Sequence, residues 1–252
     1  MYPLLIDTPY LVVPTYLFLI SLSYCIGVVW ISKRARDRNM DYKLSLDIAL
    51  AFMIGSFVGA RLLHIVYERP DIYLERPIQI FEVWKGGFVF YGGAIAATLF
   101  CYLLIRHRKA DFLEWADLYT PLFPFGYGLG RLGCFFAGCC YGRACDYPWA
   151  VRFPEGVEAP AGVPLHPVQL YAVAFEWTVF GFILWFEKKP RAKGELFFTW
   201  LALHGVGRVM MEYFRADFRG ASPLGLSVST WISLAVIAAG VAGLARAKST
   251  PK

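Results

Sequence analysis

The sequence predicts an all-α integral membrane protein with seven transmembrane helices, its N-terminus outside the cell and its C-terminus in the cytoplasm. Apolar residues make up 58% of the 252 residues and charged residues only 17%, which is too much apolar surface for one soluble core. Basic residues gather behind alternate apolar segments, and an arginine lies inside the apolar, glycine-rich stretch 125–136. These three observations carry the prediction.

Seven apolar segments each approach the roughly 20 residues that a bilayer crossing requires. They cover about 12–31, 45–66, 87–105, 116–136, 168–186, 195–214 and 227–245. Polar residues interrupt the fourth and the sixth. No basic residue precedes Lys33, so the first segment lacks the charged start of a cleaved signal peptide and is expected to stay as an anchor. Residues 1–252 are expected to form a single transmembrane domain.

The distribution of Lys and Arg sets the expected orientation. Fifteen of the 25 basic residues follow odd-numbered segments, and the positive-inside rule places the loops after those segments in the cytoplasm. Loops 67–86, 137–167 and 215–226 then lie outside, and five prolines in 137–167 disfavour regular helix there. The net charge of +6 follows from this bias. No basic patch with interleaved aromatic residues indicates nucleic-acid binding.

Arg131 is the basic residue within stretch 125–136. Its guanidinium stays charged in a protein, and at membrane depth it is costly unless an anion or a water-filled cavity meets it. No acidic residue lies within helical reach, and the glycines around it leave room for a ligand. We therefore predict an anion pocket around Arg131.

A second group of charges lies near the end of the sixth segment. Arg208, Glu212 and Arg215 are spaced i, i+4, i+7, so Glu212 can pair with either arginine. For Arg61 and Arg215, pairing with a carboxylate and binding of a ligand are equal alternatives. Arginines converging near the outer leaflet would hold a phospholipid head group, because the planar guanidinium binds phosphate with two parallel bonds. They would also stabilise a departing phosphate.

Four cysteines crowd around the start of the loop 137–167: Cys134, Cys139, Cys140 and Cys145. Disulfides between Cys134 and Cys139 or between Cys140 and Cys145 are possible on an oxidising side. A metal site is less favoured, because the spacing C-x4-C-C-x4-C lacks the two-residue gaps of zinc knuckles. A redox or acyl-carrying thiol also remains open. We expect a structural role for at least two of these cysteines.

Two histidines lie near the predicted pocket in the sequence. His166 precedes Pro167 at the outer start of the fifth segment, where it could shuttle a proton at the interface. A cap or interface role is an equal alternative. His204 lies in the sixth segment and is expected to be a packed helix residue.

Four short stretches then occur in a fixed order along nearly the whole chain. They are Val-Trp-Lys-Gly-Gly-Phe-Val-Phe-Tyr-Gly-Gly at 83–93, Gly-Arg-Leu-Gly-Cys-Phe at 130–135 running on to Gly142 and Arg143, His-Pro-Val-Gln-Leu-Tyr at 166–171, and 207–215 with Gly-Arg at its start and Glu-Tyr-Phe-Arg at its end. In this order and spacing they resemble the prolipoprotein diacylglyceryl transferase family. The resemblance implies the same seven-span topology that the charges predict.

The resemblance also implies an activity. A diacylglyceryl group would pass from phosphatidylglycerol, or a similar anionic phospholipid, to the cysteine thiol of a lipobox-containing precursor protein, releasing glycerol phosphate. The enzyme would be a multi-pass protein of the bacterial plasma (inner) membrane with its site toward the outer leaflet. Neither a metal nor another cofactor is expected.

Site residues follow from the matched positions. Arg131 and Arg208 would grip the lipid phosphate, Glu212 would orient Arg208 or Arg215, and His166 or Tyr91 would handle the proton. The catalytic set expected from the resemblance is therefore Arg131, Arg208, His166 and Tyr91. The expected substrate-binding set is Tyr16, Gly92, Gly93, Gly133, Gly142, Arg143, Gln169, Tyr171, Glu212 and Arg215.

Four positions depart from the family pattern. Tyr91 stands where the family has a candidate base histidine, Cys134 replaces an asparagine, and Cys139 and Ala172 replace glutamates. A tyrosine pKa near 10 makes Tyr91 a weak base at neutral pH unless cations lower it. The sequence thus indicates a divergent member. The alternative function is a membrane protein that binds phospholipid or uses its cysteines for thiol redox chemistry; a small-solute transporter is disfavoured, since paired interrupted helices are lacking.

Overall fold

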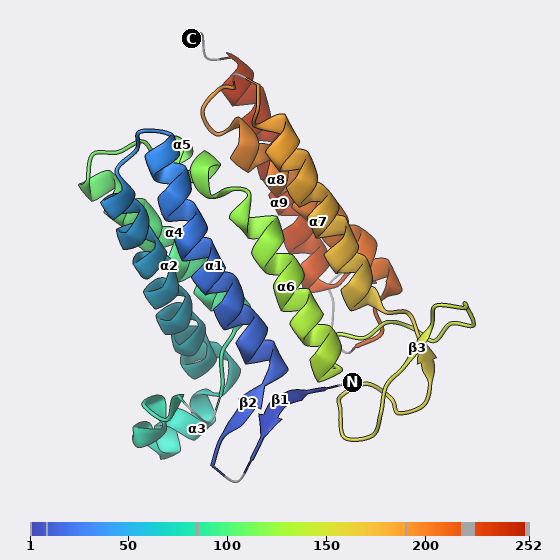
Figure 1. Ribbon diagram of the computed structural model, residues 1–252. Coiled ribbons are helices and arrows are strands. Elements are labelled where there is room, and N and C mark those ends of the chain that lie inside the picture. The colour runs from blue at the N-terminus through green and yellow to red at the C-terminus, as the bar shows by residue number, and fades with distance from the viewer. Residues whose placement is uncertain (1, 9, 84–85, 190, 218–224, 250–252) are drawn as a thin grey trace. The chain divides into compact units, whose positions relative to one another are not determined.

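The structure is a computed structural model of the chain, and it describes all residues except 1, 9, 84–85, 190, 218–224 and 250–252. The motif residues Trp84 and Lys85, together with Arg219 and Lys252, lie outside the described residues. The described helices group into two compact units, one of residues 1–27 and 116–252 and one of residues 28–115. Figure 1 shows the helices and strands of both units.

The 28–115 unit is built on two long helices. α2 (Tyr42–Leu63) and α4 (Phe90–His107) pack along each other, as Figure 1 shows. A Cβ added at Gly55 would lie 2.8 Å from the Ala97 Cα, and one at Gly93 would lie 2.8 Å from the Ser56 carbonyl oxygen. Small residues therefore let the two backbones approach closely, as in membrane helix pairs. The unit also holds the C-terminal part of α1 (Thr15–Asp37), the π-helical turn His64–Glu68, α3 (Pro70–Glu75) and the 3-10 turn Pro77–Ile80.

Arg61 organises the connection between α2 and α4. Its side chain is buried, with 7% of the residue exposed, and its guanidinium donates to backbone carbonyls of Gln79 at 2.6 Å, Ile80 at 3.3 Å and Gly87 at 3.2 Å. Within the described part of the chain it pairs with no carboxylate, so the alternative of an ion pair is not realised. Its role is to satisfy loop carbonyls that would otherwise be buried without partners.

The other unit holds a β-hairpin and the remaining long helices. β1 (Leu4–Asp7) pairs antiparallel with β2 (Val12–Pro14) just before α1. After α5 (Phe112–Tyr119), which begins in the 28–115 unit, the chain continues through four helices. These are α6 (Leu122–Ala137), α7 (Val168–Phe186), α8 (Glu195–Phe214) and α9 (Val228–Ser249). α7 lies beside α6 and α8, and α9 lies beside α8 (Figure 1).

The loop between α6 and α7 contains no helix, as its prolines predict. Its regular part is a short antiparallel ribbon of β3 (Val151–Arg152) and β4 (Pro164–Leu165), packed around the buried side chain of Phe153. An isolated bridge joins Gly142 to Arg215 at the end of α8. This bridge holds the loop against the C-terminal end of α8.

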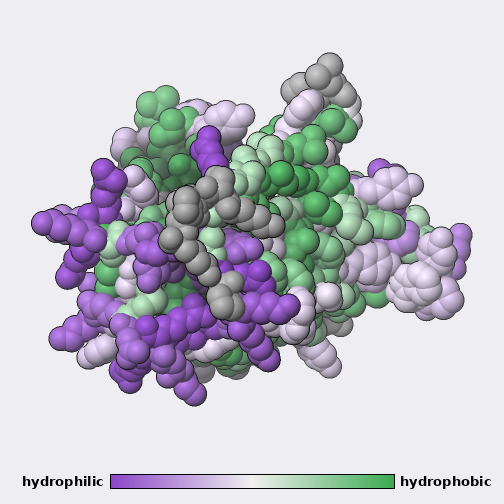
Figure 2. Space-filling model, turned by 90° about the horizontal axis from the view of Figure 1, so that it is seen from above, coloured by the Kyte–Doolittle hydropathy of each residue, from purple (hydrophilic) through white to green (hydrophobic). Residues whose placement is uncertain are grey.

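Among the described residues, five helices are long and apolar enough to cross a membrane. They are Thr15–Asp37, Tyr42–Glu68, Phe90–His107, Val168–Phe186 and Val228–Ala247. The expected fourth segment is divided at Thr120 and Pro121 into α5 and the 16-residue α6, and the sixth corresponds to the 20-residue α8, which carries charged residues. Hydrophobic and hydrophilic side chains are segregated on the face shown in Figure 2. The chain is a helical, multi-pass membrane protein.

Candidate active site

Three arginines line one small cavity in the unit of residues 1–27 and 116–252. The cavity is about 10 Å³ in volume, room for roughly one water molecule. Its lining includes Tyr127, Arg131, Cys140, Gln169, Arg208 and Arg215. The expected convergence of Arg131 and Arg208 is therefore present, with Arg215 as a third cation. We name this site the arginine pocket.

Arg131 reaches the arginine pocket from α6. Its guanidinium carbon lies 4.8 Å from the centre of the Tyr127 ring, one helical turn earlier. Within the described residues no carboxylate lies within ion-pair distance of Arg131, and its closest electrostatic neighbours are Tyr127, Cys134 and Cys140. A half-buried cation whose neighbours are aromatic rings and thiols favours an anionic ligand.

The other two arginines are held by carboxylates. Arg208 Nη2 lies 3.2 Å from Glu212 Oε2 and donates to Ser229 Oγ at 2.6 Å, so Glu212 orients Arg208 as the sequence suggested. Arg215 donates from Nε and Nη2 to the two carboxylate oxygens of Asp217, at 2.8 and 2.6 Å. Such bidentate pairing fixes the plane of the guanidinium. Asp217 was not foreseen, because it lies in a loop where no periodicity marks it.

The α6–α7 loop brings two more expected residues against the end of α8 and the start of α7. Arg143 donates from its backbone to the Phe214 carbonyl at 2.8 Å and from Nε to the Arg215 carbonyl at 3.2 Å. A Cβ added at Gly142 would lie 2.5 Å from the His166 carbonyl oxygen. Gly142 is thus required for the close contact between this loop and the start of α7.

His166 lies in an aromatic cluster at the start of α7. Its Nδ1 is 3.1 Å from the Tyr171 hydroxyl, which also accepts a hydrogen bond from Trp149 Nε1 at 2.7 Å. Since a phenol has a single O–H hydrogen, the pattern that satisfies all three groups has Tyr171 donating to Nδ1. Neutral His166 then carries its proton on Nε2. In this tautomer Nε2–H is a hydrogen-bond donor.

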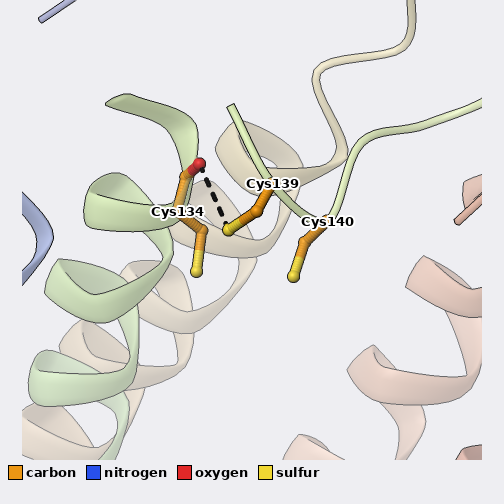
Figure 3. A group of neighbouring side chains, drawn as sticks. All are labelled: Cys134, Cys139 and Cys140. Carbon is orange, nitrogen blue, oxygen red and sulfur yellow. Dashed lines mark hydrogen bonds between the residues drawn. The ribbon is translucent and has the colours of Figure 1, made fainter. Parts of the chain in front are cut away.

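Three of the four clustered cysteines meet beside the pocket. The Sγ atoms of Cys134, Cys139 and Cys140 all lie within 4.8 Å of one another (Figure 3). All six cysteines are free thiols, so neither of the considered disulfides is formed. Hydrogen bonds with Cys134 and Cys139, and more weakly Arg215 and Arg131, lower the pKa of Cys140, whereas the hydrogen bonds with Cys134 and Cys140 raise the pKa of Cys139.

Tyr16 and Gly133 form a close contact between α1 and α6. A Cβ added at Gly133 would lie 2.9 Å from Tyr16 Cδ2 and 3.1 Å from its Cα. Through this contact, the Tyr16 ring is within electrostatic range of Arg131 and of the cysteine cluster. Both residues were expected in the site.

Three expected site residues lie in the 28–115 unit. Tyr91, Gly92 and Gly93 form the first turn of α4. The two glycines are buried against α2, Gly92 facing Gly59 and Gly93 facing Ser56, so they permit helix packing. Their part in substrate binding, and that of Tyr91 in proton transfer, stay predictions.

A buried contact between a glutamate and a histidine is not predicted from the sequence. Glu176 on α7 is 2% exposed, and its Oε1 lies 2.6 Å from His204 Nδ1 on α8. The His204 ring makes an edge contact with Tyr127 of the arginine pocket, with centroids 4.9 Å apart. The only signal was a Glu inside an apolar segment, which at membrane depth demands a partner.

Comparison with known proteins identifies the family of the chain. The family model for prolipoprotein diacylglyceryl transferase matches residues 3–246. A phosphatidylglycerol–prolipoprotein diacylglyceryl transferase of Clostridium tetani is 34% identical over 96% of both chains. Enzymes of the same name from Methylibium petroleiphilum and Bordetella avium are 37% and 34% identical, over 78% and 90% of this chain and 75% and 85% of their own.

Proposed function

The chain belongs to the prolipoprotein diacylglyceryl transferase family, and we propose that it transfers a diacylglyceryl group from phosphatidylglycerol to the cysteine thiol of a lipobox-containing precursor. The observation that carries this proposal is the convergence of Arg131, Arg208 and Arg215 on one cavity. Two of these cations already have carboxylate partners. Arg131 supplies the positive charge that remains for a lipid phosphate.

The reaction forms a thioether at an sp3 carbon. The acceptor sulfur attacks the glycerol carbon that carries the phosphate ester, and the bonding electron pair of the broken C–O bond leaves on the phosphate oxygen. Guanidinium groups aimed at that phosphate stabilise the charge that develops on it. Because the cavity holds about one water molecule, side chains around it must move apart to admit the head group.

His166 is assigned to the leaving group. In the tautomer in which Nδ1 accepts from the Tyr171 hydroxyl, 3.1 Å away, Nε2–H is left to donate a hydrogen bond to the departing glycerol phosphate. A neutral imidazole N–H donates a hydrogen bond without giving up its proton, so it stabilises the charge that develops on the departing phosphate. Deprotonation of the acceptor thiol then has to be achieved by another group.

We place the protein in the bacterial plasma membrane with seven crossings, the N-terminus outside and the reaction at the outer leaflet. The positive-inside bias supports this topology. α8 has 20 residues, about 30 Å of helix, and α6 is packed by Tyr16 of α1 and Trp177 of α7, so both can cross while shielded by protein. Fusion of a reporter to the C-terminus should report a cytoplasmic location; a periplasmic signal would refute this topology.

The activity is tested with purified protein in detergent that contains phosphatidylglycerol and a lipobox peptide. We expect a peptide whose mass increases by one diacylglyceryl group, together with an equimolar amount of glycerol phosphate. A matched peptide with Ser in place of the lipobox Cys should stay unmodified. Absence of any thioether product from several lipobox sequences, with folded protein, would contradict the proposal.

The cysteine cluster favours a second candidate function, in which the protein binds phospholipid or carries out thiol redox chemistry but transfers no lipid. The observation behind it is the meeting of three free thiols beside the arginine pocket. Counting reactive thiols before and after reduction, while measuring lipid transfer, separates the two functions. Reversible oxidation with no transfer would support the redox protein, and transfer by the fully reduced protein supports the transferase.

A further inference from the structure

The three converging thiols are placed by a sharp reversal of the chain at the end of α6. Cys134 lies in the last turn of the helix, and Gly138 ends it in the left-handed conformation with φ 69°. Cys139 N–H donates to the Cys134 carbonyl at 3.2 Å, and Cys140 is also left-handed, with φ 60°. Figure 3 shows the side chain of Cys139 pointing toward Cys134, and those of Cys134 and Cys140 pointing to the same side.

A non-glycine residue in the left-handed region is uncommon and costs about 1 kcal/mol or more. Here the strain is supported by Gln169, whose Nε2 donates to the Cys139 carbonyl at 2.7 Å. Gln169 is 1% exposed, and its Oε1 is buried without a hydrogen-bond partner although the residue lines the arginine pocket. A buried, unsatisfied acceptor at the pocket indicates that a ligand group with a hydrogen to donate belongs there.

The donor set suits a soft or borderline metal ion. Thiolates select zinc and copper(I) over magnesium or calcium, and zinc takes thiolate sulfur at about 2.3 Å. In a tetrahedron that bond length places sulfur atoms about 3.8 Å apart, so atoms already within 4.8 Å of one another need contract only slightly. The negative charge of three thiolates would be balanced by zinc and by Arg131 and Arg215, whose fields reach Cys140.

We propose that Cys134, Cys139 and Cys140 bind one zinc ion whose fourth coordination position opens to the arginine pocket, where the lipobox thiol of the precursor binds as a thiolate. Three protein ligands with one open position are the arrangement of catalytic zinc sites. Cys140 belongs both to the cysteine cluster and to the lining of the pocket. The open position is therefore adjacent to the phosphate-binding arginines. This inference rests on the proposed function for the identity of the fourth ligand.

Such a site would deprotonate the acceptor thiol, a step for which no residue lining the arginine pocket is an evident base. A thiol that coordinates zinc is deprotonated at neutral pH, and its proton passes to water. The bound sulfur then uses an electron pair to form the S–C bond as the C–O bond breaks and the phosphate oxygen takes the other pair. The thioether product is a neutral, weaker ligand, so it leaves the metal. No electron donor or acceptor is required.

Metal binding is tested first without reference to lipid transfer. Purified protein is measured for zinc per chain, and cobalt is exchanged in to report sulfur coordination through its charge-transfer absorption. We expect about one zinc per chain, at least tenfold less in Cys139→Ser and Cys140→Ser, and no loss in Cys25→Ser, whose thiol is exposed on α1. A wild-type protein free of zinc with all thiols titratable, or with a disulfide inside the cluster, overturns the site.

The fourth ligand is tested by adding a lipobox peptide to the cobalt protein. A further increase in the sulfur-to-cobalt absorption with the Cys peptide, and none with the Ser peptide, supports coordination of the acceptor; an unchanged spectrum with both overturns it. Lipid transfer is then measured with and without zinc. Full transfer by the zinc-free enzyme refutes the inference while the transferase stands. Peptide coordination without transfer supports the zinc site and refutes the proposed function.

Discussion

The side-chain amide of Gln169 donates a 2.7 Å hydrogen bond to the backbone carbonyl of Cys139. This bond joins the first turn of α7 to the loop that follows α6. It fixes the turn that presents three thiols beside three arginines. One buried amide thereby couples the geometry of the cysteine cluster to that of the arginine pocket.

Replacing Gln169 by Glu removes the N–H donor with little change in size. We expect the turn at Cys139 and Cys140 to loosen, because a buried carbonyl loses its partner at a cost of about 1–3 kcal/mol. Alkylation of both thiols, followed by mass spectrometry, should become faster in the variant. The exposed Cys25 in the same protein is an internal control and should react at an unchanged rate. Equal rates at the cluster in both proteins would show that the bond does not fix the turn.

Replacing Arg131 by Ala removes the pocket cation that has no carboxylate partner among the described residues. We expect kcat to fall about 100-fold or more, as for loss of one group that stabilises transition-state charge. Lys should restore only part of the rate, because it cannot make two parallel bonds to phosphate. Arg106→Ala, at an exposed position near the end of α4, is the control. If Arg131→Ala turns over as fast as the control, Arg131 is not part of the site.

Replacing Gly133 by Ala pushes a methyl group into Tyr16, 2.9 Å from Cδ2. We expect α1 and α6 to separate, with a lower melting temperature and slower transfer, since overpacking a close contact costs about 1–3 kcal/mol. The matched control is Gly181→Ala in α7, where an added Cβ meets nothing within 4 Å. Thermal unfolding of the two variants in the same detergent makes the comparison, and equal melting temperatures would contradict it.

Removal of Glu176 leaves His204 without its carboxylate in a mostly buried setting; the side chains are 3% and 21% exposed. We expect Glu176→Ala to lower the free energy of unfolding by about 1–3 kcal/mol, the usual cost of leaving one partner of a buried hydrogen bond unsatisfied. Glu176→Gln keeps an acceptor for His204 and should cost less. Glu155→Ala, in an exposed part of the α6–α7 loop, controls for loss of charge. In chemical unfolding, Glu176→Ala should lower the free energy of unfolding most, Glu176→Gln less and Glu155→Ala least. A Glu176→Ala variant as stable as the control would contradict the structural role of the contact.

Asp117 on α5 caps the start of α8. Its two carboxylate oxygens accept from the backbone N–H of Gly194 at 2.7 Å and of Phe197 at 2.9 Å. Asp117→Ala should destabilise the protein by about 1–2 kcal/mol, the usual cost of losing an N-terminal cap. Hydrogen exchange should accelerate in the first turn of α8, and unchanged exchange there would show that the cap contributes nothing.

Much of the fold was predictable because each long helix carries a local signal. Segments 168–186 and 195–214 coincide with α7 and α8. Pro167 and Gly194 come directly before these two apolar runs and mark where the helices begin. The fourth segment was misjudged as one helix, because Pro121 lies inside an apolar run and a proline does not show from sequence alone whether it bends or divides a helix. The tertiary grouping into two units has no local signal.

Site residues within the matched motifs could be predicted from the sequence. Contacts between residues far apart in the chain could not. The meeting of Arg131 with Arg208 was expected and is present. The spacing of the cysteines along the chain favours a disulfide over a metal site. The left-handed turn at Cys140 brings three thiols together, which the spacing alone does not predict. Glu176 and His204 pair across two helices, a contact that one sequence does not reveal.

The central claim is that Arg131 serves lipid transfer to a lipoprotein thiol, and its most direct measurement is lipoprotein maturation in bacterial cells depleted of their own transferase. The account predicts that this chain restores thioether-lipidated lipoprotein and growth, and that Arg131→Ala, expressed in the membrane at the same level, does not. Persistent accumulation of unmodified precursor with abundant, folded wild-type protein would contradict it.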